Sequence, residues 1–342
     1  MRALLTVVVL LLAVPLAALA AEKKELVITL PGGSYEVGWK KNVLEPFSKK
    51  YGVTFRIVPG LTMETVAKMR AQKGNPEIDV VTLDTVGALQ AEAEGLFEPI
   101  DPSRIPNMAK MYPIFRNRSK NFVYYKYSTQ VIAYNTEKVK KPLSYEDLWK
   151  PEYKGHVAIP DINTSHGVTF LMMAARMNGG SEKKIEPGIE KIKTLKPNLY
   201  TIWTAHDQLA QLFAREEVWI AYWVSDRVPN LMDAKIPVNW VIPKESAYLV
   251  DTVQGIPKGC KNKELAEKYI DFVLSAEVQA ANARDIYLGP VNMEAVKLLS
   301  SEDQKKLPLG EDLVANLIPV DWQYVNTVRP AWTELWNREI AR

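Results

Sequence analysis

Cysteine is nearly absent from this chain. Its 342 residues include one cysteine, Cys260, and three histidines. A single thiol cannot close an internal disulfide bond, so Cys260 is either a buried, inert residue or a stray thiol. Its lysine-rich neighbourhood is only a weak argument for an activated thiol, and we favour the inert alternative.

Catalytic and cofactor motifs are also missing. The sequence contains no G-x-S-x-G, H-E-x-x-H, C-x-x-C or Walker pattern, the spacings by which several enzyme and nucleotide-binding classes are recognised. The histidines, His156, His166 and His206, do not have the spacing of metal ligands, so His166 is interpreted as a helix cap or surface residue. We expect no catalytic residue, no cofactor and no metal site.

A strong excess of charge is absent too. The chain has 43 Lys and Arg against 40 Asp and Glu, for a formal net charge of +3, and no basic tract. Nucleic acid and membrane surfaces are therefore not expected partners. Hydrophobic residues make up 47% and charged residues 24%, a balance typical of a globular protein.

Long hydrophobic runs are confined to the first twenty residues. Arg2 is followed by apolar residues 3–13, interrupted only by Thr6, and then by the small-residue site Ala18-Leu19-Ala20. This layout predicts a cleavable signal peptide over residues 1–20, too short to favour a membrane anchor. No cysteine follows the site, so we expect a periplasmic protein that is not a lipoprotein. The remainder is long enough for two domains.

Strands and helices are predicted to alternate in the first part of the chain. The expected strands cover 25–30, 53–58 and 78–83, with helices over 63–72 and 86–94, which predicts a parallel sheet covered on both faces. In α/β sheets ligands collect beyond the carboxyl ends of strands. Two candidate sites follow: the loop with Ser34 and Tyr35, and the strand end at Asp84 and Thr85. For Asp84 the alternatives are a helix cap alone, or a helix cap that also contacts the ligand.

The middle of the chain, residues 128–161, predicts a crossover from one domain to another. An apolar strand ends at Tyr134-Asn135-Thr136, a proline-bounded helical turn follows, and a second strand covers residues 157–159. The turn carries the run DLWKPEYKG over residues 147–155. This order of motifs resembles bacterial periplasmic solute-binding proteins of the polyamine-binding family, which serve ABC importers. The later runs VIPKE, 241–245, and IPKG, 256–259, also resemble family signatures.

Further candidates lie in the second half of the chain. The hydroxyl group of Thr164 precedes an expected helix over 168–177, and Trp223 ends an aromatic strand over 219–223, just before Asp226 and Arg227. Alternation places Trp219, Ala221 and Trp223 on one strand face and Tyr222 on the other. Asp251 lies within an apolar strand, where a carboxylate needs a partner. Either a ligand ammonium group or Arg227 could pair with it.

The resemblance implies a two-lobed α/β protein of the type II periplasmic binding fold, with a ligand cleft that closes about hinge strands. We expect lobe one from 22–129 plus 253–298, and lobe two from 130–252 plus 299–342. The resemblance also implies that an ABC permease is the partner and that the protein is monomeric. The candidate ligand-binding residues, from the resemblance and from the residues themselves, are Ser34, Tyr35, Asp84, Thr85, Thr164, Trp223, Asp226, Arg227, Asp251, Tyr287 and Gln323.

The ligand expected from the resemblance is a small amine-bearing metabolite, similar to a polyamine. Two departures favour alternatives: Leu249 stands where polyamine binders carry a tryptophan, and residues 163–165 replace acidic residues. Arg227 adds a cation that suits a carboxylate. A carboxylate or zwitterion is therefore the second hypothesis. Ferric ion is a third, because 15 tyrosines are present, although packing explains Tyr124 and Tyr125.

Overall fold

The computed structural model describes residues 24–32, 34–116 and 118–341. The predicted signal peptide lies outside the described residues. Within these ranges, no helix combines the length and apolarity needed to cross a bilayer.

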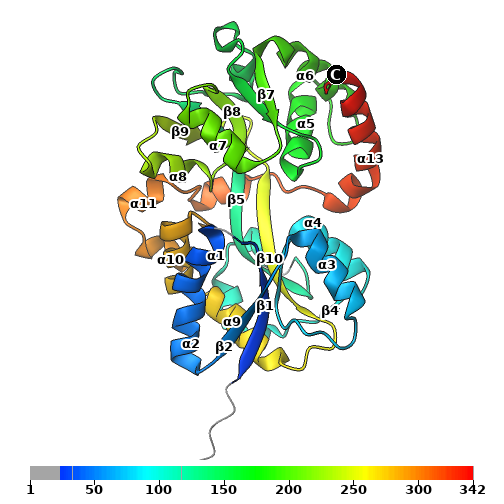
Figure 1. Cartoon of the computed structure of the whole chain (residues 1–342), viewed down its shortest axis with the longest axis vertical. Helices are drawn as coiled ribbons and strands as arrows, with labels where there is room; N and C mark the ends of the chain where they lie inside the picture. Colours follow the sequence, from blue (N-terminus) through cyan, green and yellow to red (C-terminus); the bar gives the residue numbers. More distant parts are fainter. Residues whose placement is uncertain (1–23, 33, 117, 342) are drawn as a thin grey trace, which may run out of the picture.

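One long strand organises the molecule. Strand β5 (Phe122–Asn135) is rich in aromatic and β-branched residues, which favour extended backbone. Its first half pairs antiparallel with β10 (Leu249–Pro257), and its second half pairs antiparallel with β8 (Ile220–Val224) and β9 (Val238–Val241). Figure 1 shows β5 and β10 running from one lobe into the other. The two lobes therefore share a continuous sheet.

Lobe one is built around a short parallel pair and a mixed sheet. Strand β1 (Glu25–Leu30) pairs in parallel with β2 (Thr54–Pro59), whereas β3 (Val81–Asp84) pairs antiparallel with β10. The three strands predicted from sequence are indeed parallel, because Ile28 of β1 also forms a parallel bridge with Val80, next to β3. The returning hinge strand β10 adds an antiparallel neighbour to β3, so the sheet is mixed. The other elements are α1 (Ser34–Trp39), the π-helix Lys40–Leu44, α2 (Glu45–Tyr51), α3 (Thr62–Ala71), α4 (Thr85–Ala93), β4 (Phe97–Glu98), α9 (Lys263–Val273), α10 (Ala276–Ile286) and β11 (Gly289–Pro290).

Lobe two contains three parallel strands in the order β8, β6 (Val157–Pro160) and β7 (Leu199–Trp203). Each is followed by a helix. These helices are α5 (Ser165–Met177), α7 (His206–Ala214) and α8 (Val228–Asp233), while α6 (Glu186–Leu195) packs against α5. Strand β7 was not predicted. The strand faces alternate as expected for Ala221, Tyr222 and Trp223, but Trp219 differs because its ring stacks on His156 with the centroids 3.6 Å apart.

Short 3-10 helices complete the connections. Ser144 caps the predicted helical turn of the crossover by accepting from the amide of Glu146. The 3-10 segments are Pro102–Arg104, Pro106–Lys110, Pro113–Phe115, Tyr145–Trp149, Pro151–Tyr153, Lys196–Asn198 and Met293–Leu298.

The third passage between lobes lies later than predicted. Leu299 packs with α10 residues of lobe one, and Leu317 belongs to the lobe-one core, whereas Val320 belongs to the core of lobe two. The crossing therefore falls between Leu317 and Val320, and its placement near Leu299 was wrong. Helices α11 (Ser301–Lys305) and α12 (Glu311–Asn316) precede this crossing, and α13 (Trp322–Glu339) follows it.

Candidate ligand-binding site

The carboxyl ends of β6, β7 and β8 bring three polar side chains to one edge of the lobe-two sheet. His166 lies in the first turn of α5, His206 is the first residue of α7, and Arg227 precedes α8. The rings of His166 and His206 meet edge to face, with centroids 4.9 Å apart. Because N-terminal amides of helices carry positive partial charge, this edge favours anions.

Aromatic residues hold the two histidines in place. The indole Nε1 of Trp223 donates to Nδ1 of His206 at 2.9 Å, and the amide nitrogen of Gln130 lies 2.8 Å from Nδ1 of His166. Trp203 packs against both imidazoles. Burial lowers the pKa of His166 to about 3 and, with a smaller contribution from Arg227, the pKa of His206 to about 4. Both rings are therefore neutral at neutral pH.

A lysine on the hinge strand connects this edge to lobe one. Nζ of Lys126 on β5 lies 3.8 Å from Oδ2 of Asp226, while Oδ1 of Asp226 is buried without a hydrogen-bond partner among the described residues. Burial works to raise the pKa of Asp226, yet the charges of Lys126 and Arg227 hold it below its usual value. Lys126 was missed from sequence, although a lysine inside an apolar strand was a usable signal.

The charge of the same lysine also acts on Asp84, at the end of β3 in lobe one. Desolvation raises its pKa, and the nearby charge of Lys126 opposes that shift. Its side chain makes no capping hydrogen bond to α4, so the capping role considered from sequence is wrong. The surrounding protein desolvates Asp84, yet its side chain keeps accessible surface, which leaves its carboxylate open to a ligand.

Asp251 is paired within the protein. One carboxylate oxygen accepts from Thr85 Oγ1, and the other accepts from Nη1 of Arg118 at 2.9 Å. The pairing of Asp251 with Arg227 that was considered from sequence is therefore wrong. Arg118, which packs over the ring of Tyr124, comes from a loop 133 residues earlier, and no local pattern marked it. Thr85 and Asp251 are buried, and Asp251 already has a cationic partner in Arg118, so neither needs a ligand to complete its interactions.

Other predicted site residues also have protein partners. The hydroxyl groups of Tyr35 and Tyr125 share a hydrogen bond of 2.6 Å, and Thr164 caps α5 by accepting from the amide of Gly167. Tyr287 donates to Asp233. Gln323 is exposed in the first turn of α13, and the side chain of Ser34 lies outside the described part. Trp223 is 1% exposed, so it supports His206 from behind.

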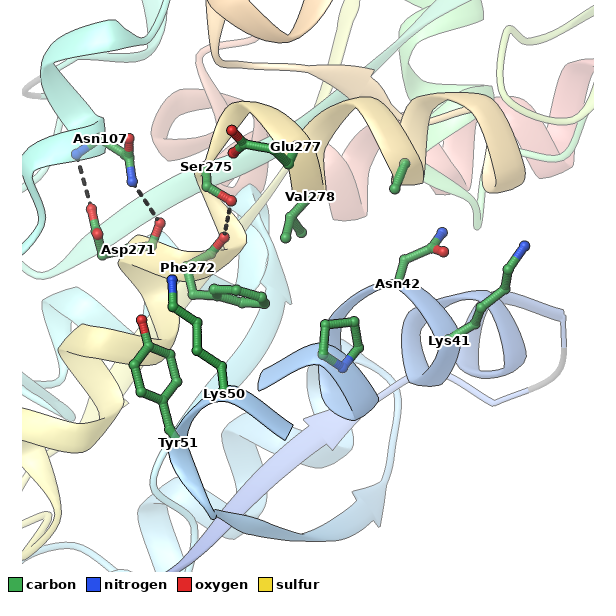
Figure 2. A pocket seen from close by; sticks show the side chains of 12 residues that line it. Lys41, Asn42, Lys50, Tyr51, Asn107, Asp271, Phe272, Ser275, Glu277 and Val278 are labelled. Carbon is green, nitrogen blue, oxygen red and sulfur yellow. Dashed lines mark hydrogen bonds between the residues drawn. The ribbon is translucent and has the colours of Figure 1, made fainter. Parts of the chain in front are cut away.

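A separate pocket of about 460 Å³ lies on lobe one, between the helices that follow β1 and helices α9 and α10. Figure 2 shows Lys41, Asn42 and Lys50 on one side of it, with Phe272 and Glu277 on the other. None of the predicted site residues lines this pocket. Across the described ranges, no group of His, Cys, Asp and Glu side chains could hold a metal ion.

Comparison with known proteins decides the family. Residues 42–309 match the family described as bacterial extracellular solute-binding protein. The chain belongs to this family. The relationship expected from the crossover motifs is confirmed, and the protein binds a solute for an ABC transport system and is not an enzyme.

The relatives cover most of the chain. The spermidine/putrescine-binding periplasmic protein of Escherichia coli K12 is 29% identical over 285 residues, covering 78% of this chain and 80% of the relative. The gamma-aminobutyric acid-binding protein of Pseudomonas aeruginosa is 25% identical over 323 residues, covering 90% and 88%. An ABC transporter structure from Clostridium perfringens is 33% identical, with a TM-score of 0.79 over 92% of this chain and 99% of that chain. This likeness confirms the two-lobed α/β fold.

Proposed function

We propose that this solute-binding protein captures a small zwitterion, a molecule with an amine at one end and a carboxylate at the other. The observation that carries the proposal is the balanced charge at the junction of the lobes, where Lys126 lies 3.8 Å from Asp226, the charge of Lys126 also acts on Asp84, and Arg227 also acts on Asp226. The unpartnered Oδ1 of Asp226 supplies an acceptor for an ammonium group. Arg227 supplies a donor for a carboxylate.

A polyamine fits this arrangement less well. A diamine places a cation at both ends and would need both Asp84 and Asp226 as partners, which would leave the charges of Lys126 and Arg227 without an anion to offset them. Asp251 is a poor additional partner, because it is buried and Arg118 already balances its charge. The names of the relatives include both ligand types, a polyamine and gamma-aminobutyric acid, so both belong in the test.

The test uses three molecules with the same four-carbon chain: putrescine, γ-aminobutyrate and succinate. A ligand that binds the native state raises the melting temperature Tm in proportion to ln(1 + [L]/Kd). We expect γ-aminobutyrate to raise Tm and the other two to have little effect at equal concentration. A shift with putrescine and none with γ-aminobutyrate would overturn the proposal in favour of a diamine ligand.

We further propose that residues 1–20 are removed on export and that the mature protein is a periplasmic monomer without a lipid anchor. Support comes from the charged, apolar and small-residue regions of that segment and from the periplasmic names of the relatives. The near-balanced charge also argues against nucleic acid as a partner. Mass spectrometry of the exported protein, with light scattering, tests cleavage and oligomeric state together.

A further inference from the structure

We propose that His166 and His206 form a neutral pair of Nε2–H donors that binds the carboxylate group of the ligand. The proposal deepens the proposed function and rests on it, because it assigns one end of the zwitterion to named atoms. The pair lies at the carboxyl ends of β6 and β7, where α5 and α7 begin.

The hydrogen bonds at Nδ1 determine which nitrogen of each ring carries the proton. An indole N–H can only donate, so Nδ1 of His206 must accept from Trp223 and its proton must lie on Nε2. The amide nitrogen of Gln130 is likewise only a donor, so Nδ1 of His166 accepts and its proton also lies on Nε2. Each ring is thus fixed as an Nε2–H donor.

These donors lack acceptors within the protein. Among the described residues, neither histidine Nε2 has a hydrogen-bond partner, and both side chains are partly exposed. The indole Nε1 of Trp203, which contacts both rings, is buried and also has no acceptor. Buried donors are nearly always paired in native proteins. The two Nε2 groups lie on partly exposed side chains and have no protein acceptor, so they are available to an acceptor that comes from outside the chain.

A carboxylate is the acceptor that this environment favours. Two planar N–H donors from neighbouring rings can each meet one oxygen, and charged acceptors form the stronger hydrogen bonds. The N-termini of α5 and α7 add positive potential. An ammonium group would meet the two Nε2–H donors of the pair, which repel it. Its place is the unpartnered oxygen of Asp226.

The charges around the pair keep it neutral. Lys126 of β5 and Arg227 after β8 disfavour a proton on the rings, while Asp226 after β8 and Asp207 of α7 oppose them. Burial also disfavours the protonated rings, and the pKa of both histidines stays well below 6. The affinity for a carboxylate should therefore stay level as the pH falls from about 8 to about 6.

The experiment compares His206→Gln with His206→Asn by calorimetric titration with γ-aminobutyrate. A glutamine amide reaches the position of Nε2 and can replace the donor, whereas an asparagine amide reaches only the position of Nδ1. We expect glutamine to retain affinity within a few fold and asparagine to lose roughly tenfold to a hundredfold. His156→Gln and His156→Asn are the matched controls, because His156 stacks on Trp219, away from the site.

A second readout is independent of affinity. ¹⁵N NMR of the imidazoles should show the Nε2–H form for His166 and His206 without ligand and a downfield Nε2 proton with γ-aminobutyrate. Equal affinity of both His206 variants and the wild type, or an Nδ1–H form, would overturn the proposal. Binding of succinate that depends on His206, without binding of γ-aminobutyrate, would keep the carboxylate site and overturn the zwitterion. Binding of putrescine alone would overturn both.

Discussion

At the scale of single residues, Asp251 illustrates how the protein neutralises a carboxylate in its hinge. The side chain is 8% exposed, and its pKa is raised because desolvation outweighs the help from Thr85 and Arg118. A buried ion pair of this kind contributes little by itself, but its loss leaves an uncompensated charge. Arg118 therefore matters more to stability than most partly exposed arginines.

We predict that Arg118→Ala lowers the free energy of unfolding by about 3 kcal/mol at neutral pH. The loss should shrink on acidification. A raised carboxyl pKa means that the native state takes up a proton at a higher pH than the unfolded state, so stability recovers as pH falls through the folded pKa. Urea unfolding at several pH values measures this. Asp251→Asn in the same background should remove the pH dependence, and a loss independent of pH would instead indicate packing.

Asp226 is the residue we expect to bind the ligand amine. Its lowered pKa keeps it ionised at neutral pH, and one oxygen is unpartnered. We predict that Asp226→Asn weakens binding of γ-aminobutyrate by roughly tenfold to a hundredfold, since hydrogen bonds to charged groups contribute about 1.5–3 kcal/mol. Calorimetry measures the change. Asp207→Asn, at an exposed position in the first turn of α7, is the control, and equal affinity of both variants would place the amine elsewhere.

At the scale of elements, much of the strand and helix order follows from local pattern. β1 has the bounds that the sequence predicted, and α5 starts only a few residues before the expected helix. Pairing was harder to predict, because the antiparallel neighbour of β3 comes from β10, far along the chain. The same distance along the chain explains why only part of the site was predicted. Trp223, Asp226 and Arg227 were found from one strand end, whereas Lys126 and the histidine pair gain their meaning only from contacts between distant segments.

The start of α5 is tightly fixed against the end of β6. A Cβ atom added to Gly167 would overlap with the carbonyl group of Asp161, so we predict that Gly167→Ala displaces the first turn of α5, which carries His166. Overpacking of this kind typically costs about 1–3 kcal/mol, and affinity for γ-aminobutyrate should fall with it. Thermal unfolding and calorimetry measure the two effects. Gly32→Ala, where an added Cβ meets nothing within 4 Å, should change neither.

At the scale of the whole molecule, each lobe has a core of its own, and the lobes meet where α4 packs against α13 and where the chain passes between them. β5, β10 and the segment around Ile318, which bridges to Tyr248, are the passages between them. A side-chain clasp adds to these: Asp233 of lobe two accepts from Tyr287 and, at 2.6 Å, from Lys306, both on the lobe-one side. Passages between lobes allow hinge motion, and the clasp opposes opening.

We predict that Tyr287→Phe shifts the ligand-free protein toward a more open arrangement. The substitution removes one hydrogen bond of the clasp, so the radius of gyration without ligand should increase, while saturating γ-aminobutyrate should restore a compact form. The apparent affinity should fall by a few fold, because part of the binding energy is spent on closure. Small-angle scattering with and without ligand measures this. Tyr200→Phe, whose hydroxyl donates to Glu217 within lobe two, is the control. If both variants scatter like the wild type, the clasp does not influence the hinge.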